Sequence, residues 1–309
     1  MRDPVIRIEG LTKIYKGDLG KKPVVGLDHL DLEIEASEVF AFLGPNGAGK
    51  TTTIKLLTRL LRPTSGNAWI RGRSIGSKEA MHSVGFMPEQ PNFYGYLTGR
   101  EFLDFVGRIF RIPSSERKKK IELLLEKVGL AEAGDRAVRT YSRGMLQRLG
   151  MAQALLNDPD ILILDEPMSA LDPIGRREFR DLIIELKAQG KTVFFSSHIL
   201  SDAEWIADRV GILKQGKLIH TGKLDALLRE EETPVEVTFA PETGGVREAE
   251  LRAYSFVQQD KNILIRLSKE SELPLLLQKI SQWKGRVISI VPQRKSLEDV
   301  FMEKFKGGE

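Results

Sequence analysis

The stretch Val39–Thr53, VFAFLGPNGAGKTTT, constrains the fold of this chain more than any other. Its short apolar run, Val39 to Leu43, predicts a buried strand, and Thr52 to Leu61 predicts a helix. Between them lies the pattern G-x-x-x-x-G-K-T, which begins at Gly44, and a phosphate-binding P-loop requires this order of strand, loop and helix. An ordinary glycine-rich loop is the alternative, but every fixed position of the pattern is filled.

The residue types in this loop suit a bound anion. Glycines lack a Cβ, so the backbone can turn its N–H groups toward a phosphate, and the following helix N-terminus adds partial positive charge. We expect Lys50 to reach the β- and γ-phosphates and the Thr51 hydroxyl to ligate Mg²⁺. The candidate nucleotide-binding residues are Gly44, Pro45, Asn46, Gly47, Ala48, Gly49, Lys50, Thr51 and Thr52.

Length and composition narrow the class of protein. A chain of 309 residues predicts about two domains, and an apolar fraction of 41% is enough for a globular core. The sequence has no cysteine, which excludes disulfide and thiolate chemistry, and its four histidines are scattered without a zinc pattern. No apolar run reaches the length of a membrane span, and no signal-peptide core begins the chain. The net charge of +4 is a weak indication of anionic partners.

Two carboxylates follow a strongly apolar run. Ile161–Leu164 predicts a central parallel strand buried on both faces, and Asp165 and Glu166 come directly after it. Carboxylates are costly to bury without a cation or a proton-transfer role. We therefore expect Asp165 to hold Mg²⁺ and Glu166 to orient or deprotonate an attacking water. Two salt-bridged surface acids are the alternative, and the apolar run before them fits that poorly.

Three further candidates lie near the ends of predicted strands, where α/β sheets place ligand groups. Tyr15 could stack on a base or be a half-buried strand residue, and periodicity alone favours the second. Gln90 follows the predicted strand Val84–Met87, although a loop glutamine usually faces solvent. His198 follows the buried strand Thr192–Ser197, at the same edge as the other candidates, which favours a phosphate contact over a capping role.

The remaining chain divides into a helical insertion and a C-terminal module. Residues from about 91 to 157 have helical spacing, and Thr98 with Glu101 predicts a capping box at the first helix. The basic run Arg117–Lys120 is interpreted as a solvated helix face. Glu230–Pro234 predicts a linker, and residues 231–309 predict a small α+β domain without a catalytic constellation.

These features together resemble the nucleotide-binding subunit of ABC transporters, across residues 1 to about 230. The resemblance rests on Tyr15, the P-loop, Gln90, Tyr-Ser-Arg-Gly-Met at 141–145, Asp165-Glu166 with Ser-Ala-Leu-Asp at 169–172, and His198. It implies an α/β P-loop NTPase core with an antiparallel β subdomain and a helical insertion, followed by the α+β domain.

The resemblance also implies roles for these residues. Tyr15 matches the residue that stacks on adenine, and Gln90 matches the loop glutamine that touches Mg²⁺ or water and reports to the membrane subunit. Asp165 looks like the Mg²⁺ ligand, Glu166 like the catalytic base, and His198 like the histidine that holds the γ-phosphate. The implied catalytic set is Lys50, Gln90, Glu166 and His198, and the implied metal set is Thr51, Gln90 and Asp165. Asp172 falls in the loop that contacts the opposite subunit.

Residues 141–145 align with the family signature, usually Leu-Ser-Gly-Gly-Gln. Ser142 and Gly144 are kept and are expected to face the γ-phosphate of a partner subunit. Tyr141, Arg143 and Met145 depart from the signature, and Arg143 adds a cation beside a helix N-terminus. Degenerate signatures of this kind, together with a C-terminal module ending near Ser296–Phe301, resemble exporters whose membrane subunit is a separate protein.

The expected function is ATP hydrolysis by a subunit that dimerises around two Mg-ATP and drives export through an integral membrane permease. The dimer is a homodimer or a heterodimer with a similar ATPase, at the cytoplasmic, inner face of the cell membrane, with no nucleic-acid partner. Two alternatives remain open: an ABC-type ATPase acting on nucleic acid or ribosomes, and a regulatory ATP-binding module without hydrolysis.

Overall fold

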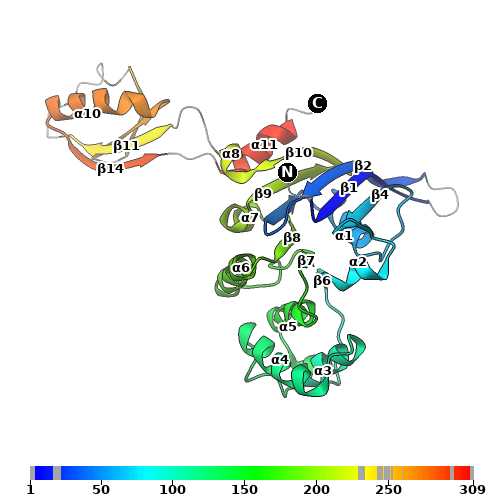
Figure 1. The fold of residues 1–309 in the computed structure, drawn as a ribbon. Helices are drawn as coiled ribbons and strands as arrows, with labels where there is room; N and C mark the ends of the chain where they lie inside the picture. The colour runs from blue at the N-terminus through cyan, green and yellow to red at the C-terminus, as the bar shows by residue number, and fades with distance from the viewer. Residues whose placement is uncertain are drawn as a thin grey trace. The chain divides into compact units, whose positions relative to one another are not determined.

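The computed structural model describes residues 4–16, 22–228, 234–241, 246, 251, 253–259, 261–292 and 296–306. The chain forms two compact units, one of residues 1–224 with 303–309 and one of residues 225–302 (Figure 1). The linker predicted at Glu230–Pro234 falls largely outside the described residues.

An antiparallel sheet of four strands begins the first unit. It has the order β2-β1-β4-β5 and comprises β1 (Ile6–Tyr15), β2 (Val24–Ile34), β4 (Ser65–Ile70) and β5 (Arg73–Ser74). Alternate residues of β1, such as Ile6 and Ile8, are fully buried, as expected for a sheet with one face on the core. Tyr15 ends β1 and pairs with Val24, so it stands at the rim of this sheet.

A six-stranded sheet forms the centre of the first unit. Its order is β10 (Lys217–Lys223), β9 (Arg209–Lys214), β3 (Val39–Leu43), β8 (Thr192–Ser197), β7 (Ile161–Leu164) and β6 (Val84–Met87). The five strands from β9 to β6 run parallel, and β10 pairs antiparallel with β9 at the edge. Every residue of β3, β7 and β8 is buried, which explains their nearly continuous apolar sequences.

The loops that follow β3, β7 and β8 leave the same edge of this sheet, because these strands are parallel. Helices continue the chain beyond them: α1 (Lys50–Leu57) after β3, α6 (Pro173–Ala188) after β7 and α7 (Leu200–Ile206) after β8. Two short helices lie elsewhere, α2 (Lys78–His82) before β6 and α8 (Leu224–Leu228) after β10. Helix α1 begins at Lys50, two residues before the predicted start, since Gly49 with φ 111° ends the loop at its N-cap. The P-loop, Asp165, Glu166 and His198 are thereby placed at one edge of the sheet.

The insertion between β6 and β7 is helical, as predicted (Figure 1). It contains α3 (Gly99–Ile109), α4 (Ser114–Lys127), the short 3₁₀ helix η1 (Val138–Thr140) and α5 (Arg143–Leu155). The capping box at Thr98 and Glu101 is confirmed by reciprocal hydrogen bonds. The interpretation of the basic run is wrong for Arg117, which is buried and bonds to Asp104 of α3.

The second unit is a four-stranded antiparallel sheet with helices, which confirms its α+β class. The sheet has the order β12 (Ser255–Gln259), β13 (Asn262–Leu267), β11 (Val235–Ala240) and β14 (Arg286–Pro292). The helical segments are η2 (Glu270–Glu272) and α10 (Leu273–Gln282), and the boundary with the first unit falls within α11 (Leu297–Lys306), after Met302. Its core joins alternate residues of β11 and β13 to Leu276, Ile280 and Trp283. Within the described ranges, no helix has the length and apolarity needed to cross a bilayer.

Candidate active site

The loop between β3 and α1 is held open by glycines in conformations that other residues rarely adopt. Gly47 has φ 79° and Gly49 has φ 111°. A Cβ built on Gly49 would come within 2.5 Å of the Gly26 carbonyl oxygen, so a side chain there would displace backbone. The glycines therefore allow a tight backbone loop before the N-terminus of α1, where the helix has unpaired N–H groups.

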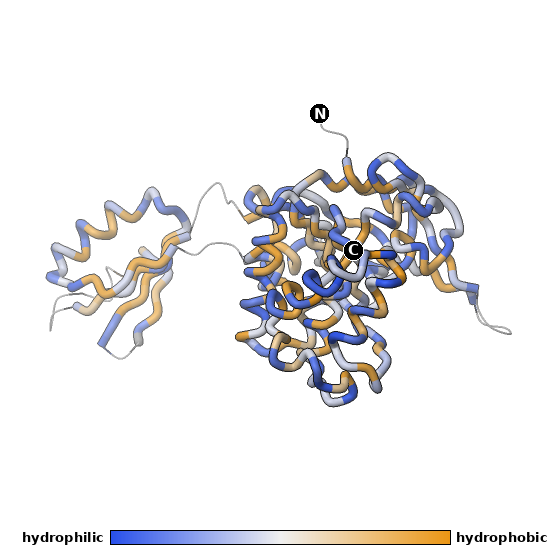
Figure 2. Tube along the Cα trace, turned by 60° about the horizontal axis from the view of Figure 1, so that its bottom comes forward, coloured by the Kyte–Doolittle hydropathy of each residue, from blue (hydrophilic) through white to orange (hydrophobic). Residues whose placement is uncertain are grey.

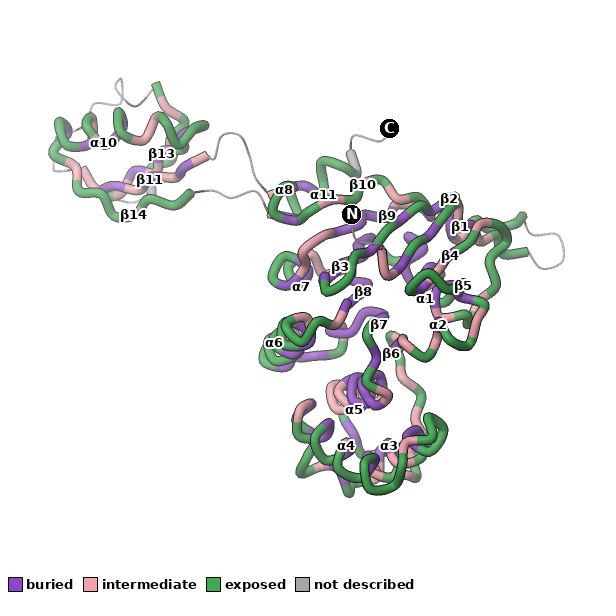
Figure 3. Tube along the Cα trace, in the orientation of Figure 1, coloured by how far each residue is buried: buried purple, intermediate pink, exposed green. Residues whose placement is uncertain are grey.

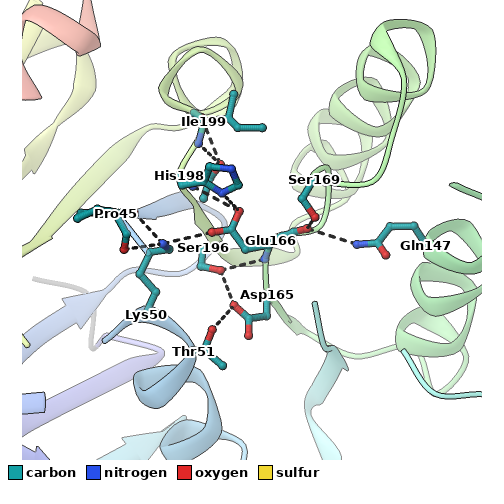
Figure 4. Close-up of polar contacts among 12 residues, drawn as sticks. Pro45, Lys50, Thr51, Gln147, Asp165, Glu166, Ser169, Ser196, His198 and Ile199 are labelled. Carbon is teal, nitrogen blue, oxygen red and sulfur yellow. Dashed lines mark hydrogen bonds and ion pairs between the residues drawn. The ribbon is translucent and has the colours of Figure 1, made fainter. Parts of the chain in front are cut away.

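Lys50, Glu166 and His198 form a chain of polar contacts in which the first two side chains are buried and His198 is exposed (Figure 4). Lys50 Nζ lies 3.2 Å from Glu166 Oε1, and both side chains are less than a tenth exposed, at 6% and 7%. Lys50 also donates to the carbonyl oxygens of Gly44 at 2.7 Å and Pro45 at 3.3 Å. His198 Nδ1 lies 2.8 Å from Glu166 Oε2. Glu166 thus stands between the loop lysine and the histidine that follows β8.

The neighbouring carboxylate of Asp165 is buried among hydroxyl groups. Its Oδ1 accepts hydrogen bonds from Ser196 Oγ at 2.6 Å and Thr51 Oγ1 at 3.3 Å. Burial raises the pKa of Asp165 above its ordinary value, and the two hydroxyl donors lower it in part. A nearby divalent cation would relieve the cost of burying this charge.

The backbone of Glu166 is strained and heavily bonded. Its φ of 48° lies in the left-handed region, which a glutamate seldom adopts. The N–H donates to Ser196 Oγ at 2.9 Å, and the carbonyl accepts from Gln147 at 3.3 Å and Ser169 at 3.0 Å. Contacts from β8, α5 and the loop after β7 therefore fix the direction of this carboxylate.

A pocket of ≈ 450 Å³ opens in front of these groups. Tyr15 lies at its rim, with its hydroxyl 3.1 Å from Thr52 Oγ1, and its ring packs on Gly26, where a Cβ would come within 2.5 Å of the ring. The ring is partly exposed, and Lys13 Nζ lies over it at 5.6 Å from the ring centroid. The pocket is lined by Tyr15, Val24, Val25, Gly26, Asn46, Gly47, Gly49, Lys50, Thr51, Thr52, Glu89, Glu166 and His198.

Comparison with known proteins finds relatives of this chain among ABC transporter ATP-binding proteins. A profile of the ABC transporter family matches residues 27–169. An uncharacterised ABC transporter ATP-binding protein of a Synechocystis species is 40% identical, with 98% of this chain and 85% of the relative covered. The bacitracin transport ATP-binding protein of Bacillus licheniformis is 38% identical, with 98% of each chain covered. The lantibiotic transport ATP-binding protein of Streptococcus pyogenes is 39% identical over 74% of this chain and 95% of the relative.

Solved structures agree with these relatives. The dimeric, post-hydrolysis ATP-binding cassette MJ0796 bound to ADP and phosphate has a TM-score of 0.65 at 28% identity, over 71% of this chain and 98% of that chain. This chain belongs to the ATP-binding proteins of ABC transporters. It is therefore an ATPase coupled to transport, which uses ATP and Mg²⁺ and has the P-loop NTPase fold that the sequence predicts.

The residues of this ABC ATPase suit Mg-ATP. No group of three or more His, Cys, Asp or Glu side chains that could hold a metal occurs in the part of the chain that is described. That agrees with Mg²⁺, which proteins usually hold by one or two carboxylates together with substrate phosphates. Asp165 and Thr51 are the side chains placed for it, because their oxygens converge beside the N-terminus of α1. When bound, Mg²⁺ would neutralise charge on the phosphates.

The structure brings Glu89 to the pocket, in the place expected for Gln90. Glu89 lines the pocket, whereas Gln90 is exposed and is absent from its walls. The role predicted for Gln90 stays a prediction. Both residues follow β6, and the sequence signal that could have found Glu89 is its carboxylate at a strand end, beside Asp165 of the neighbouring strand.

The signature residues Ser142 and Gly144 are not part of this pocket. Ser142 is the N-cap of α5, and its hydroxyl accepts from the Met145 N–H at 3.2 Å. Helix α5 begins at Arg143, because Ser142 caps it there. Asp172 likewise caps α6 through the Gly175 N–H at 2.7 Å. Both loops are exposed at helix N-termini, where the dipole favours an anion or an acceptor.

Tyr141 explains one departure from the usual signature. Its ring is buried in the helical insertion and its hydroxyl donates to the Ala133 carbonyl at 2.7 Å. The same hydroxyl occupies the space that a Cβ on Gly99 would need. Tyr141 is thus an internal anchor that ties the start of α5 to the loop before η1, while Arg143 beside it is exposed.

Proposed function

We propose that two copies of this chain pair head to tail, each P-loop facing the other chain's signature, and enclose two Mg-ATP. One observation carries the proposal: Ser142 and Gly144 do not line the pocket that contains Lys50 and Glu166 of the same chain. A single chain therefore offers its nucleotide only one wall. The dimeric cassette structures that this chain resembles are consistent with a second wall from a partner.

In this arrangement each residue of the pocket has a distinct task. Lys50 binds the β- and γ-phosphates, and Tyr15 stacks on the base. Glu166 accepts a proton from the attacking water, since its carboxylate is held by Lys50 on one side and His198 on the other. Ser142 of the partner chain donates to the γ-phosphate, so the closed dimer lasts only until that phosphate is released.

The proposed site of action is the cytoplasmic face of the cell membrane, bound to an integral membrane permease. Helix α5 connects the partner's ATP site to the hydrolytic site of its own chain, because it starts at Ser142 and its Gln147 side chain contacts the Glu166 carbonyl. Closure on ATP would move the helical insertion and so act on the permease. Export is the proposed direction, supported by relatives named for bacitracin and lantibiotic transport.

The Glu166→Gln variant tests the proposal. Loss of the carboxylate removes the proton acceptor but keeps the side chain's size, so we expect hydrolysis to fall about 100-fold or more while ATP binding persists. Size-exclusion chromatography with light scattering should then show a dimer in Mg-ATP and a monomer without nucleotide. A Glu116→Gln variant, on the exposed surface of α4, is the matched control. A Glu166→Gln chain that stays monomeric in saturating Mg-ATP would contradict the head-to-tail dimer.

A further inference from the structure

Strand β14 forms one outer edge of the sheet in the second unit. It pairs with β11, and no other strand of the described chain pairs with it. Four of its seven residues are apolar and exposed: Val287 at 38%, Ile288 at 48%, Ile290 at 40% and Val291 at 47%. Figure 3 shows most of this strand as exposed. An edge of this kind can accept hydrogen bonds and apolar contacts from another strand.

Charged side chains, proline and β-bulges are among the features by which folded proteins protect such an edge. The five central residues of β14 contain no charge and no proline, and they lie between Arg286 and Pro292, with a bulge at Ile288. The opposite edge, β12, is more polar, since its sequence is Ser-Phe-Val-Gln-Gln. The hydrophobic core of the unit is built by β11, β13 and α10, and the exposed side chains of β14 are not part of it. Figure 2 shows the strands of this unit as largely hydrophobic.

The central residues of β14 read the same in both directions. Residues 287–291 read Val-Ile-Ser-Ile-Val, a palindrome centred on Ser289. If two such strands pair antiparallel about a two-fold axis at Ser289, Val287 lies opposite Val291 and Ile288 opposite Ile290. Cross-strand pairs of β-branched residues are among the favourable ones. Each side of the contact then presents the same apolar surface, as a two-fold interface requires.

We propose that β14 pairs with β14 of a second copy, so that the second units join within the ATPase dimer. The inference rests on the proposed homodimer, because only a second copy of this chain supplies the same palindromic strand. A bulge at Ile288, which lies between the partners of Thr238 and Phe239, leaves that side chain without a partner residue on β11. Its apolar side chain is thereby left for the outer contact.

The size of this contact fits a secondary interface. A pair of seven-residue strands buries far less than the roughly 1,200 Å² of a stable independent interface. It would therefore fail to hold two free chains together. Once two chains are joined through their ATP sites, the second units are confined together at an effective concentration on the order of millimolar, at which a weak contact forms.

Cysteine cross-linking tests the proposal in the full chain, which has no cysteine of its own. Ser289→Cys is introduced into the Glu166→Gln background, and Ser255→Cys on β12 is the matched control. With Mg-ATP and a short bis-maleimide, we expect Ser289→Cys to give a covalent dimer at least about tenfold faster than the control, since directly opposite Cβ atoms lie about 5 Å apart. Without nucleotide, the rate should fall to that of the control.

A second variant separates pairing from folding. Val291→Lys adds a charge to the exposed edge and should abolish the Ser289→Cys cross-link, whereas Val257→Lys on β12 should preserve it; circular dichroism checks that both variants fold. An ATP-driven dimer in which Ser289→Cys reacts no faster than Ser255→Cys would overturn the β14 contact and leave the ATP dimer intact. Absence of any ATP-driven dimer would instead overturn the proposed function. A cross-link that persists in Val291→Lys would also contradict the pairing.

Discussion

Glu166 is held by residues from three separate segments, which is why its direction is well defined. Lys50 and His198 contact the carboxylate, while Ser196 and Gln147 hold the backbone of the same residue. Lys50 belongs to the P-loop helix and Gln147 to the signature helix. The candidate base is therefore bonded both to the loop that would bind ATP and to the helix that would reach the partner's ATP. A shift of either one changes its position.

Glu89 gives a prediction at the residue scale. Glu89 lines the pocket together with Thr51, so we expect Glu89→Ala to raise the Mg²⁺ concentration needed for half-maximal ATPase activity about 10- to 100-fold, the usual effect of losing an outer metal contact. Gln90→Ala is the control and should leave this concentration unchanged, because Gln90 is outside the pocket walls. Steady-state hydrolysis over a series of Mg²⁺ concentrations measures both. A larger effect in Gln90→Ala would restore the role that the sequence resemblance implies.

The sequence predicts the residues of the site better than their contacts. The P-loop, Asp165, Glu166 and His198 follow strands or precede a helix, so pattern and periodicity place them at one sheet edge. Ser196 was read only as part of a buried strand, yet its hydroxyl bridges Asp165 and the Glu166 N–H. That contact depends on the register of β7 with β8, in which Leu164 pairs with Phe195, and no local pattern encodes it.

At the scale of elements, the helical insertion is joined by a buried ion pair. Arg117 of α4 donates from Nε to Asp104 of α3 at 2.6 Å, and its Nη1 donates to the Ile112 carbonyl at 2.6 Å. The hydrogen bond from Arg117 is the largest cause that lowers the pKa of Asp104. The sequence shows a run of four basic residues, and nothing in its spacing distinguishes the one that faces α3 from the exposed Lys118 and Lys119.

Arg117→Met should weaken the insertion by about 2 kcal/mol, since Asp104 keeps only its hydrogen bond from Arg108 and the Ile112 carbonyl loses its donor. A carboxyl whose folded pKa lies below its ordinary 3.8 stabilises the fold above that pH and loses this stabilisation as pH falls through the folded pKa. The difference from wild type in free energy of unfolding should therefore shrink from about pH 7 to about pH 3. Urea unfolding across this range measures it. Lys118→Met is the control, and an equal loss in both variants would contradict the ion pair.

Elements with strong periodicity or continuous apolar sequence were predicted well, and their ends less well. The buried strands β3, β7 and β8 appear where the apolar runs are. Helix α1 begins two residues before its predicted start, because Gly49 acts as its N-cap, and Ser142 has the same position at α5. The glycine lies inside the P-loop pattern and the serine inside the signature. The sequence pattern indicates nucleotide binding for both residues and does not predict that they also cap helices.

At the scale of the whole molecule, the head-to-tail dimer predicts that two defective chains repair each other. Lys50→Ala removes the phosphate-binding cation of the chain that carries it. Ser142→Asp keeps a good N-cap for α5, since aspartate caps as well as serine, but places a negative charge against the partner's γ-phosphate. In the Glu166→Gln background, each variant alone should fail to dimerise in Mg-ATP, because both of its composite sites are damaged.

A mixture of the two variants should dimerise. In the mixed pair, one site combines both lesions, and the other combines an intact P-loop with an intact signature. We therefore expect hetero pairs, captured through different affinity tags, with about one ATP per pair instead of two. Ser201→Asp, on the exposed surface of α7, serves as the control for an added charge and should dimerise alone. If each chain enclosed its ATP by itself, mixing would restore nothing, because every chain in the mixture would still carry a lesion in its only site.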